Sequence, residues 1–251
     1  MEIGARPDSI AGGGDIPGKM AILKCHGYDF LELPLTREEI ARLGPGSAAG
    51  WVTAVERTGL PIRSTSMGHF GGFAALPPDE RAEIVAHIRA LIPLTRALGA
   101  DTILLATHED GGDPAGHAAI YRQALLPVAE EADRAGITLA LEHVRPYKPF
   151  LLAELVRALD HPAVRIYFDI GNCLTVGESP IEQARVCAPL TAQLHLKGGP
   201  TTPLAAMPLV QVREILETAG FRGRGCLEIP GGEGERPLAE ARGLLKMAGY
   251  W

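Results

Sequence analysis

Four side chains that can bind a metal ion each stand at the downstream end of a short, β-prone run of the sequence. They are Glu142, Asp169, His195 and Glu228. Successive members lie about 30 residues apart, which is the length of one strand-plus-helix unit. If such units close into a parallel barrel, the carboxyl ends of all the strands meet at one rim. We therefore expect the four side chains to converge on one point.

This set of side chains indicates a cation. Three carboxylates brought together repel each other strongly unless a positive charge lies among them, and a buried acid is costly unless it is paired or bound to a metal. Carboxylate oxygens with one imidazole suit Mn²⁺, Mg²⁺ or Co²⁺ better than a structural Zn²⁺. We therefore predict one divalent metal ion, with Mn²⁺ as the first choice. Any one of these residues alone is explained as well by a surface position or a salt bridge.

The elements that must position these side chains alternate regularly along the chain. Strand-like and helix-like segments follow one another, which predicts parallel strands joined by right-handed crossovers. Eight strands favour a closed (β/α)8 TIM barrel, and no change in composition divides residues 1–251 into separate domains. An open doubly wound sheet is the alternative, but its glycine-rich phosphate-binding fingerprint is absent after the first strand. The predicted strands are 1–5, 30–33, 61–66, 102–107, 137–142, 164–169, 192–195 and 225–228.

Several local signals predict where helices begin and end. Thr36 opens a helix with a capping-box pattern, and a single helix is expected over 115–135, ended by Gly136 in the left-handed conformation. Pro93 is expected to kink or end its helix because proline lacks an N–H group. The segment 67–76 contains three glycines and two phenylalanines. It can be a loop that closes over a substrate or an ordinary loop packed by its own rings.

Composition argues against several classes of partner. The net charge is −6 and no cluster of Lys and Arg is present, so neither nucleic acid nor an anionic membrane surface is expected. No apolar run approaches the ~20 residues that span a bilayer, and no basic-then-apolar leader opens the sequence. The four cysteines form no C-x-x-C pair and indicate buried, reduced thiols in a cytoplasmic protein. They are Cys25, Cys173, Cys187 and Cys226.

The sequence resembles the sugar phosphate isomerase/epimerase superfamily, the xylose isomerase-like barrels, over nearly its whole length. The matching segments are Gly-Tyr-Asp-Phe-Leu-Glu-Leu at 27–33, Leu-Glu at 141–142, Phe-Asp-Ile-Gly-Asn at 168–172, Leu-His-Leu-Lys at 194–197 and Leu-Glu at 227–228. The resemblance to ketose 3-epimerases and hydroxypyruvate isomerase-like members implies that Glu142, Asp169, His195 and Glu228 bind one divalent metal. It also implies that the two glutamates are the catalytic residues that move the proton.

The chemistry of such a centre explains why its product is hard to predict. A metal that holds a carbonyl oxygen and a neighbouring hydroxyl stabilises an enediolate, and two carboxylates can remove and return the proton. Return to the same carbon gives an epimer, and return to the neighbouring carbon gives an isomer. We expect an isomerase or epimerase acting on a keto sugar or related hydroxy-carbonyl compound. The alternatives are a metal-dependent lyase or dehydratase, including C-glycoside cleavage, and a non-catalytic barrel that binds a sugar or a partner.

Two histidines raise the question of a nuclease. His69 and His108 lie at or just after the third and fourth strands, where superfamily endonucleases that act on abasic sites bind additional zinc ions. Those enzymes have a histidine in place of Asn172 and an Asp-x-His motif, which is absent here. A three-metal nuclease is therefore disfavoured. We expect His69, His108 and Asn172 to contact substrate, with structural roles as the alternative for the two histidines.

Four further residues are candidate substrate contacts. His143 stands where many relatives have proline, so it can be an extra base or bond a neighbouring loop. Arg145 can bind a substrate anion or pair with a surface acid. Lys197 shares the strand face of His195 and can reach a substrate oxygen. Glu32 can contact substrate or form a salt bridge in the barrel mouth. Relatives in the superfamily are often dimers or tetramers, so a homo-oligomer is also expected.

Overall fold

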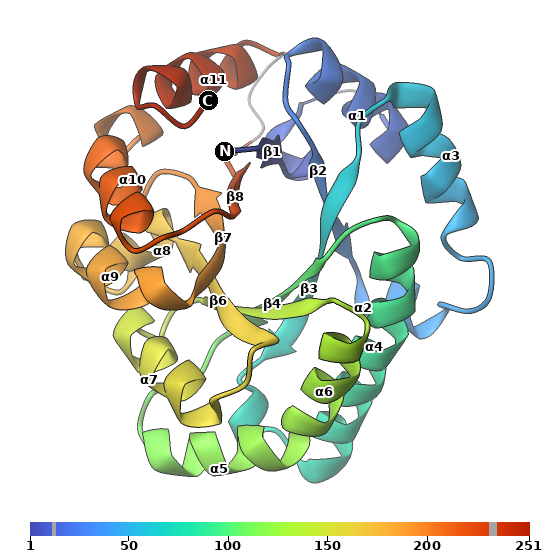
Figure 1. Ribbon diagram of the computed structural model, residues 1–251, viewed down its shortest axis with the longest axis vertical. Helices are drawn as coiled ribbons and strands as arrows, with labels where there is room; N and C mark the ends of the chain where they lie inside the picture. The colour runs from blue at the N-terminus through green and yellow to red at the C-terminus, as the bar shows by residue number, and fades with distance from the viewer. Residues whose placement is uncertain (12–13, 231–234) are drawn as a thin grey trace.

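Eight parallel strands form a closed barrel in which each strand pairs with the next and β8 pairs with β1 (Figure 1). The computed structural model describes residues 1–11, 14–230 and 235–251. The predicted TIM barrel is confirmed, and each strand lies at or beside its expected position. The strands are β1 (Ile3–Ala5), β2 (Leu31–Leu35), β3 (Ile62–Gly71), β4 (Thr102–Thr107), β5 (Thr138–His143), β6 (Val164–Asp169), β7 (Thr191–Leu196) and β8 (Arg224–Leu227).

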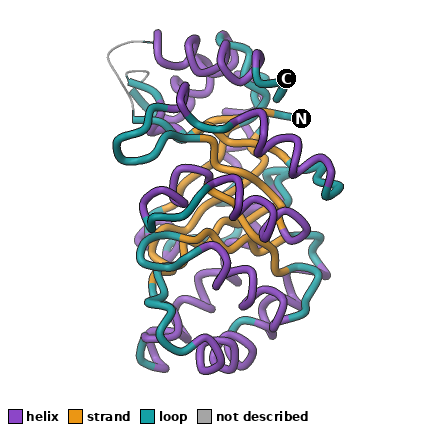
Figure 2. The backbone as a smooth tube through the Cα atoms, turned by 90° about the vertical axis from the view of Figure 1, so that its left-hand side faces the viewer, coloured by secondary structure: helices purple, strands orange, loops and turns teal. Residues whose placement is uncertain are grey.

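Helices surround the strands, as both the ribbon and the side view show (Figures 1 and 2). Because each crossover places a helix on the outside of the barrel, the strands are covered on their outer face and read as nearly continuous apolar runs. The helices are α1 (Ile16–Cys25), α2 (Arg37–Ala41), α3 (Ala49–Thr58), α4 (Pro78–Ala97), α5 (Pro114–Ala124), α6 (Leu126–Arg134), α7 (Pro149–Leu159), α8 (Ile170–Thr175), α9 (Pro180–Cys187), α10 (Leu209–Thr218) and α11 (Arg236–Met247).

The core has two parts, and strand alternation separates them. The larger cluster fills the space between strands and helices, whereas a smaller one lies inside the barrel and includes Leu104, Ala140, Tyr167 and Cys226. Residues two apart on a strand face the same side. The side chains that follow these interior residues by two positions therefore also face the barrel axis, at its carboxyl-terminal mouth.

Two helix predictions differ in part from the structure. The segment 115–135 is divided at Leu125 into α5 and α6, because Pro127 cannot donate the hydrogen bond that a continuous helix needs there. Pro93 lies inside α4, which continues from Pro78 to Ala97. Buried side chains on both sides of Pro93, including Ile92 and Leu94, pack this helix against the barrel. That packing outweighs the one hydrogen bond that the proline removes.

Other local predictions were confirmed. Thr36 and Glu39 form the capping box at the start of α2, and Gly136 has φ 71°, which suits the residue that follows a helix end. β3 extends to Gly71, so half of the segment 67–76 is strand. Phe70 and Phe73 in this segment are fully buried and stack with their ring centroids 4.9 Å apart, which favours an ordinary packed loop.

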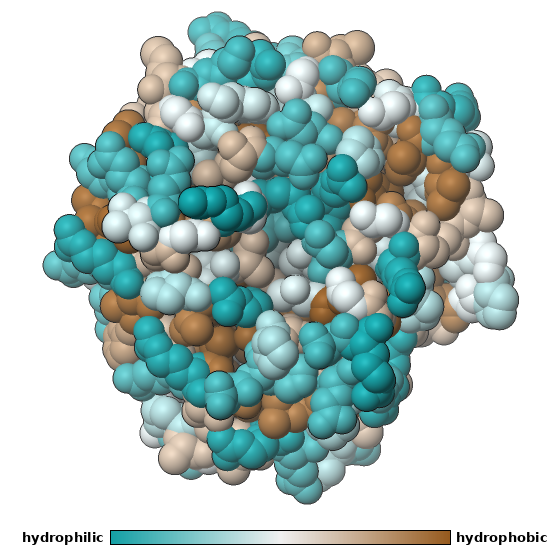
Figure 3. All heavy atoms as spheres, viewed as in Figure 1, coloured by the Kyte–Doolittle hydropathy of each residue, from teal (hydrophilic) through white to brown (hydrophobic). Residues whose placement is uncertain are grey.

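The surface offers little continuous apolar area. In the face drawn in Figure 3, hydrophobic side chains are scattered among hydrophilic ones and do not merge into one patch. Val210 and Met247 are the exposed large hydrophobic residues in the described part of the chain. None of the helices described there has both the length and the apolar character for crossing a bilayer. Cys25 is exposed, contrary to expectation, while the other three cysteines are buried and all four are free.

Candidate metal centre

The four expected side chains meet at the carboxyl-terminal mouth of the barrel. Glu142 belongs to β5, Asp169 ends β6, His195 belongs to β7 and Glu228 directly follows β8. Each offers one ligand-type atom, and these atoms all lie within 4.8 Å of one another. The first three residues are buried and Glu228 is half-buried. Barrel closure therefore produces the convergence that the strand-end pattern predicted.

His195 faces the three carboxylates through one ring nitrogen. Its Nδ1 lies 2.8 Å from Oε1 of Glu142, 3.2 Å from Oε2 of Glu228 and 3.6 Å from Oδ2 of Asp169. Burial alone would lower the pKa of His195, but the charges of Glu228, Glu142 and Glu32 raise it well above its usual value. The imidazole therefore carries a proton that a metal ion on Nδ1 would replace.

The two oxygens of Asp169 have different partners. Oδ1 of Asp169 accepts hydrogen bonds of 2.8 Å from the backbone N–H groups of Gly171 and Asn172, which caps α8. A Cβ at Gly171 would collide with the carbonyl of Gly198, so a glycine is needed for this close approach. Oδ2 of Asp169 is buried and faces the ammonium group of Lys197 at 2.7 Å and Nδ1 of His195 at 3.6 Å. A buried carboxylate oxygen of this kind needs positive charge beside it.

Lys197 supplies positive charge to the same oxygens. Its Nζ lies 2.7 Å from Oδ2 of Asp169 and 2.8 Å from Oε2 of Glu228. Burial opposes the charged forms, but this pairing raises the pKa of Lys197 and, with His195, holds the pKa of Asp169 well below its usual range. The ammonium group therefore stays charged at the edge of the four-residue centre.

The carboxyl group of Glu142 has a raised pKa. Burial raises the pKa of Glu142 to about 7, although the imidazole of His195 lowers it. Asn172 helps to orient the carboxyl group, because its Nδ2 lies 3.4 Å from Oε1 of Glu142 and donates a 3.0 Å hydrogen bond to the carbonyl of His143. A carboxyl group with a pKa near 7 can both take and release a proton.

The residues at the mouth fit a divalent metal ion. Three carboxylates and one imidazole nitrogen can surround one point, since one ligand-type atom from each residue lies within 4.8 Å of the others. This donor set is rich in oxygen, which favours Mn²⁺, Mg²⁺ or Co²⁺ over metals that prefer thiolates. Glu142, Asp169, His195 and Glu228 are the side chains that would hold the ion.

The remaining predicted contacts fall into two groups. Lys197 and Asn172 join the centre, whereas His108 and Arg145 are exposed at the rim, where Nδ1 of His108 lies 3.4 Å from the carbonyl of Arg145. His69 turns toward the outer layer, since its Nε2 lies 3.1 Å from Nδ1 of His87 on α4. The rim therefore carries fewer of the predicted polar contacts than the sequence suggested.

His143 and Glu32 are both enclosed. His143 is fully buried against Phe168 and Cys173. Burial lowers its pKa to about 4, so the ring is neutral. Because it directly follows Glu142 on β5, its side chain points to the opposite face of the strand. Glu32 is fully buried inside the barrel, with Nε2 of His195 at 3.2 Å. This position favours the salt-bridge interpretation of Glu32 over a direct contact with substrate.

Several polar residues near the centre were missed. Tyr167 and Gln193 stand two residues before Asp169 and His195, so the two-residue alternation of strands could have identified them. Arg6 follows β1, and its Nε lies 3.8 Å from Oε1 of Glu228. No pattern in the sequence marks Arg6, because its position depends on the closure of the barrel between β8 and β1.

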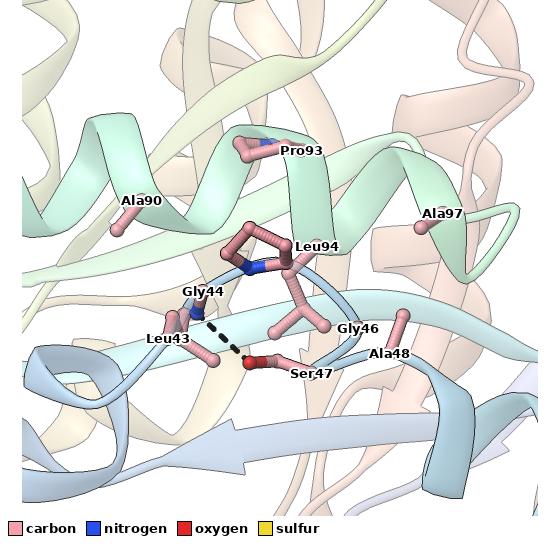
Figure 4. A pocket seen from close by; sticks show the side chains of 10 residues that line it. Leu43, Gly44, Gly46, Ser47, Ala48, Ala90, Pro93, Leu94 and Ala97 are labelled. Atoms are coloured by element: carbon pink, nitrogen blue, oxygen red, sulfur yellow. Dashed lines mark hydrogen bonds between the residues drawn. The ribbon is translucent and has the colours of Figure 1, made fainter.

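A separate cavity of about 390 Å³ lies in the outer layer, between the loop 43–48 and α4 (Figure 4). The backbone N–H of Gly44 donates a 2.9 Å hydrogen bond to Oγ of Ser47 across the loop. The ten residues that line this cavity are small or apolar, and none of them is titratable. This cavity therefore offers no chemistry comparable to that of the barrel mouth.

The sequence matches the model of the xylose isomerase-like TIM barrel family over residues 20–248. The protein therefore belongs to the xylose isomerase-like TIM barrels, as the motifs around the four strand ends predicted. No curated protein matches the sequence.

Solved structures with the same fold include sugar epimerases and a zinc-bound protein. The 3-keto-D-glucoside 4-epimerase YcjR from E. coli, in its apo form, is 16% identical with a TM-score of 0.78, covering 99% of this chain and 98% of that chain. The IolI protein with a bound zinc atom is 15% identical with a TM-score of 0.82, over 100% and 99% of the two chains. D-psicose 3-epimerase with D-tagatose, from Clostridium cellulolyticum H10, is 16% identical with a TM-score of 0.77, over 100% and 99%. At these identities the similarity establishes the fold alone.

Proposed function

We propose that the protein is a divalent-metal-dependent enzyme that isomerises or epimerises a keto sugar or a related hydroxy-carbonyl compound through an enediolate. The observation that carries this proposal is the meeting of Glu142, Asp169, His195 and Glu228 within 4.8 Å at the barrel mouth. Active sites of TIM-barrel enzymes lie at this end of the strands. Structural neighbours that act on 3-keto-D-glucosides and D-psicose add support from the same fold.

In this proposal the four residues hold the ion and two of them also transfer the proton. Held by Glu142, Asp169, His195 and Glu228, a divalent ion would polarise the substrate carbonyl and would stabilise the negative charge that develops on its oxygen. Glu142 removes the proton next to the carbonyl as a general base. Glu228, whose side chain is 24% exposed, returns the proton as a general acid.

Other residues bind and orient the substrate. The ammonium group of Lys197 supports the oxygen on which negative charge grows, because it is positioned beside Asp169 and Glu228 and remains charged. Asn172 keeps the carboxyl group of Glu142 in place. His108 and Arg145, at the exposed rim, contact the more distant hydroxyl groups of the sugar.

Mn²⁺ is the proposed ion because oxygen ligands predominate. The zinc atom in the IolI structure makes Zn²⁺ the competing choice. Elemental analysis of the purified protein, followed by reloading of chelated protein with each metal separately, identifies the ion that supports turnover.

Heavy water distinguishes the proposed reaction from its alternatives. The loaded protein is incubated with a panel of keto sugars in D₂O, and products are analysed by NMR and mass spectrometry. Solvent deuterium in an epimeric or isomeric product supports the proposal. An unsaturated or cleaved product would instead indicate a lyase. Tight sugar binding without any deuterium exchange would indicate a binding protein and refute the proposal.

A further inference from the structure

A layer of buried polar groups lies directly beneath the metal centre, inside the barrel. Its central member is Glu32, which is fully buried. Oε2 of Glu32 accepts a 2.6 Å hydrogen bond from the hydroxyl of Tyr167 and a 3.2 Å hydrogen bond from Oγ of Ser64. Arg6 places its Nη1 3.4 Å from Oε1 of the same carboxylate. Glu32 is therefore fixed in position from three directions and stays ionised.

His195 is the fourth neighbour of Glu32. One ring nitrogen of His195 faces Glu32, and the other faces the three carboxylates of the metal centre. Nε2 of His195 lies 3.2 Å from Oε1 of Glu32, while Nδ1 faces Glu142, Asp169 and Glu228. A neutral imidazole carries its proton on only one nitrogen, and the other nitrogen must then act as acceptor or metal ligand. When a metal ion replaces the proton on Nδ1, a carboxylate fixed against Nε2 keeps the second proton on Nε2 and so directs the lone pair of Nδ1 to the metal.

We propose that Glu32 is a positioning residue that selects the Nε2-protonated form of His195 and aims Nδ1 at the metal. The inference rests on the proposed metal-binding role of His195. Carboxylates that accept the second N–H of a metal-bound histidine fix its tautomer and ring orientation, and their loss typically costs 10–100-fold in metal affinity. Glu32 thereby serves the reaction without touching the substrate.

The competing explanation is that Glu32 only satisfies the buried hydroxyls of Tyr167 and Ser64. Glu109 provides a matched control, because it is also a buried carboxylate that accepts a 2.8 Å hydrogen bond from a tyrosine hydroxyl, that of Tyr121. Its second partner is the backbone N–H of Ala74, at 2.8 Å, instead of a histidine. A general effect of losing a buried acid would appear equally in variants of Glu109.

The experiment compares Glu32→Gln, Glu32→Leu and Glu109→Gln with the wild type. Mn²⁺ alone is titrated into each metal-free protein by calorimetry, and circular dichroism checks folding. In protein loaded with diamagnetic Zn²⁺, ¹⁵N NMR of the imidazole reports which nitrogen of His195 keeps its proton. We expect a roughly 10–100-fold loss of affinity in Glu32→Leu with a change in the His195 tautomer. Glu32→Gln keeps an acceptor oxygen and should lose less, and Glu109→Gln should match the wild type.

The possible failures are distinguishable. If the wild type binds no metal, the proposed function falls and this role of Glu32 falls with it. If the wild type binds Mn²⁺ and Glu32→Leu binds it equally well, only the role of Glu32 is refuted. Should Glu32→Leu not fold, Tyr167→Phe provides the test, since it removes the shortest hydrogen bond to Glu32 while retaining the ring. Unchanged affinity and an unchanged His195 tautomer in Tyr167→Phe and Glu32→Gln would refute the proposal.

Discussion

Replacing Lys197 with methionine should strengthen metal binding while impairing turnover. The Lys197 ammonium group lies 2.7 Å from Oδ2 of Asp169 and 2.8 Å from Oε2 of Glu228. Both oxygens belong to proposed metal ligands. A metal ion at these oxygens must compete with the positive charge of the lysine. Methionine keeps most of the length of the side chain but removes the charge, so the competition disappears.

The expected size of the effect follows from the two ion pairs. The side chain of Lys197 is 22% exposed, and the side chains of Asp169 and Glu228 are 0% and 24% exposed. Exposed ion pairs contribute about 0–1 kcal/mol each to the free energy. Because the two contacts of Lys197 are partly buried, we expect them to contribute about 1–3 kcal/mol together. Since 1.4 kcal/mol corresponds to a tenfold change in affinity, Lys197→Met should bind Mn²⁺ roughly 5–150 times more tightly.

Calorimetric titration of Mn²⁺ into metal-free wild type and Lys197→Met, in one buffer at one ionic strength, measures this difference. Lys148→Met is the control, because Lys148 forms a 2.7 Å ion pair with Glu178 away from the centre. Turnover of Lys197→Met should fall although its metal site is filled, since the positive charge beside the reacting oxygen is lost. Weaker or unchanged metal binding in Lys197→Met would refute the idea that the ammonium group competes with the ion.

Three further outcomes are expected. Glu142→Gln and Glu228→Gln should each lose solvent deuterium exchange while retaining measurable metal, and wild-type exchange in either variant would exclude that glutamate as an acid or base. Metal uptake at pH 7 should release protons because the raised pKa of His195 keeps it protonated beforehand, and calorimetry in two buffers of different ionisation enthalpy counts them. Burial and the neighbouring His87 lower the pKa of His69 in the folded protein. The unfolded chain therefore binds a proton at His69 more readily, and the folded state loses stability as the pH falls below the pKa of His69 in the unfolded chain. Denaturant unfolding of His69→Gln at pH 7 and 5 should therefore show a smaller loss than the wild type.

The positions of the four strand-end residues could be predicted because barrel closure fixes them. Once the alternation of strands and helices is accepted, the end of β5 must lie near the end of β7, so Glu142 and His195 must approach each other. The direction of a side chain is harder to predict. His69 lies four residues after Thr65 on β3, so the two side chains share one face of the strand. Both face α4, where they meet His87 and Thr95, and the prediction that His69 lies at the mouth overlooked this alternation.

The roles of Glu32 and Arg6 could not be predicted because they depend on contacts across the barrel. Glu32 meets His195 from a strand 163 residues away in the sequence, and no local pattern specifies which interior side chains touch.

Helix ends were predictable only where a local signal acts alone. The capping box at Thr36 is such a signal, whereas the continuity of α4 through Pro93 depends on packing against the barrel.

In the proposed reaction, the groups that would stabilise the intermediate are separate from the groups that would select the substrate. The charged groups that would stabilise an enediolate come from strand ends and are held from below by Glu32 and its neighbours, so their geometry is rigid. The groups that would distinguish one sugar from another, such as His108 and Arg145, are exposed and belong to the segments that follow β4 and β5. Loops of this kind vary while the scaffold remains constant. Exchange of the rim segments should therefore change the choice of substrate, whereas changes beneath His195 should weaken every reaction that the centre supports.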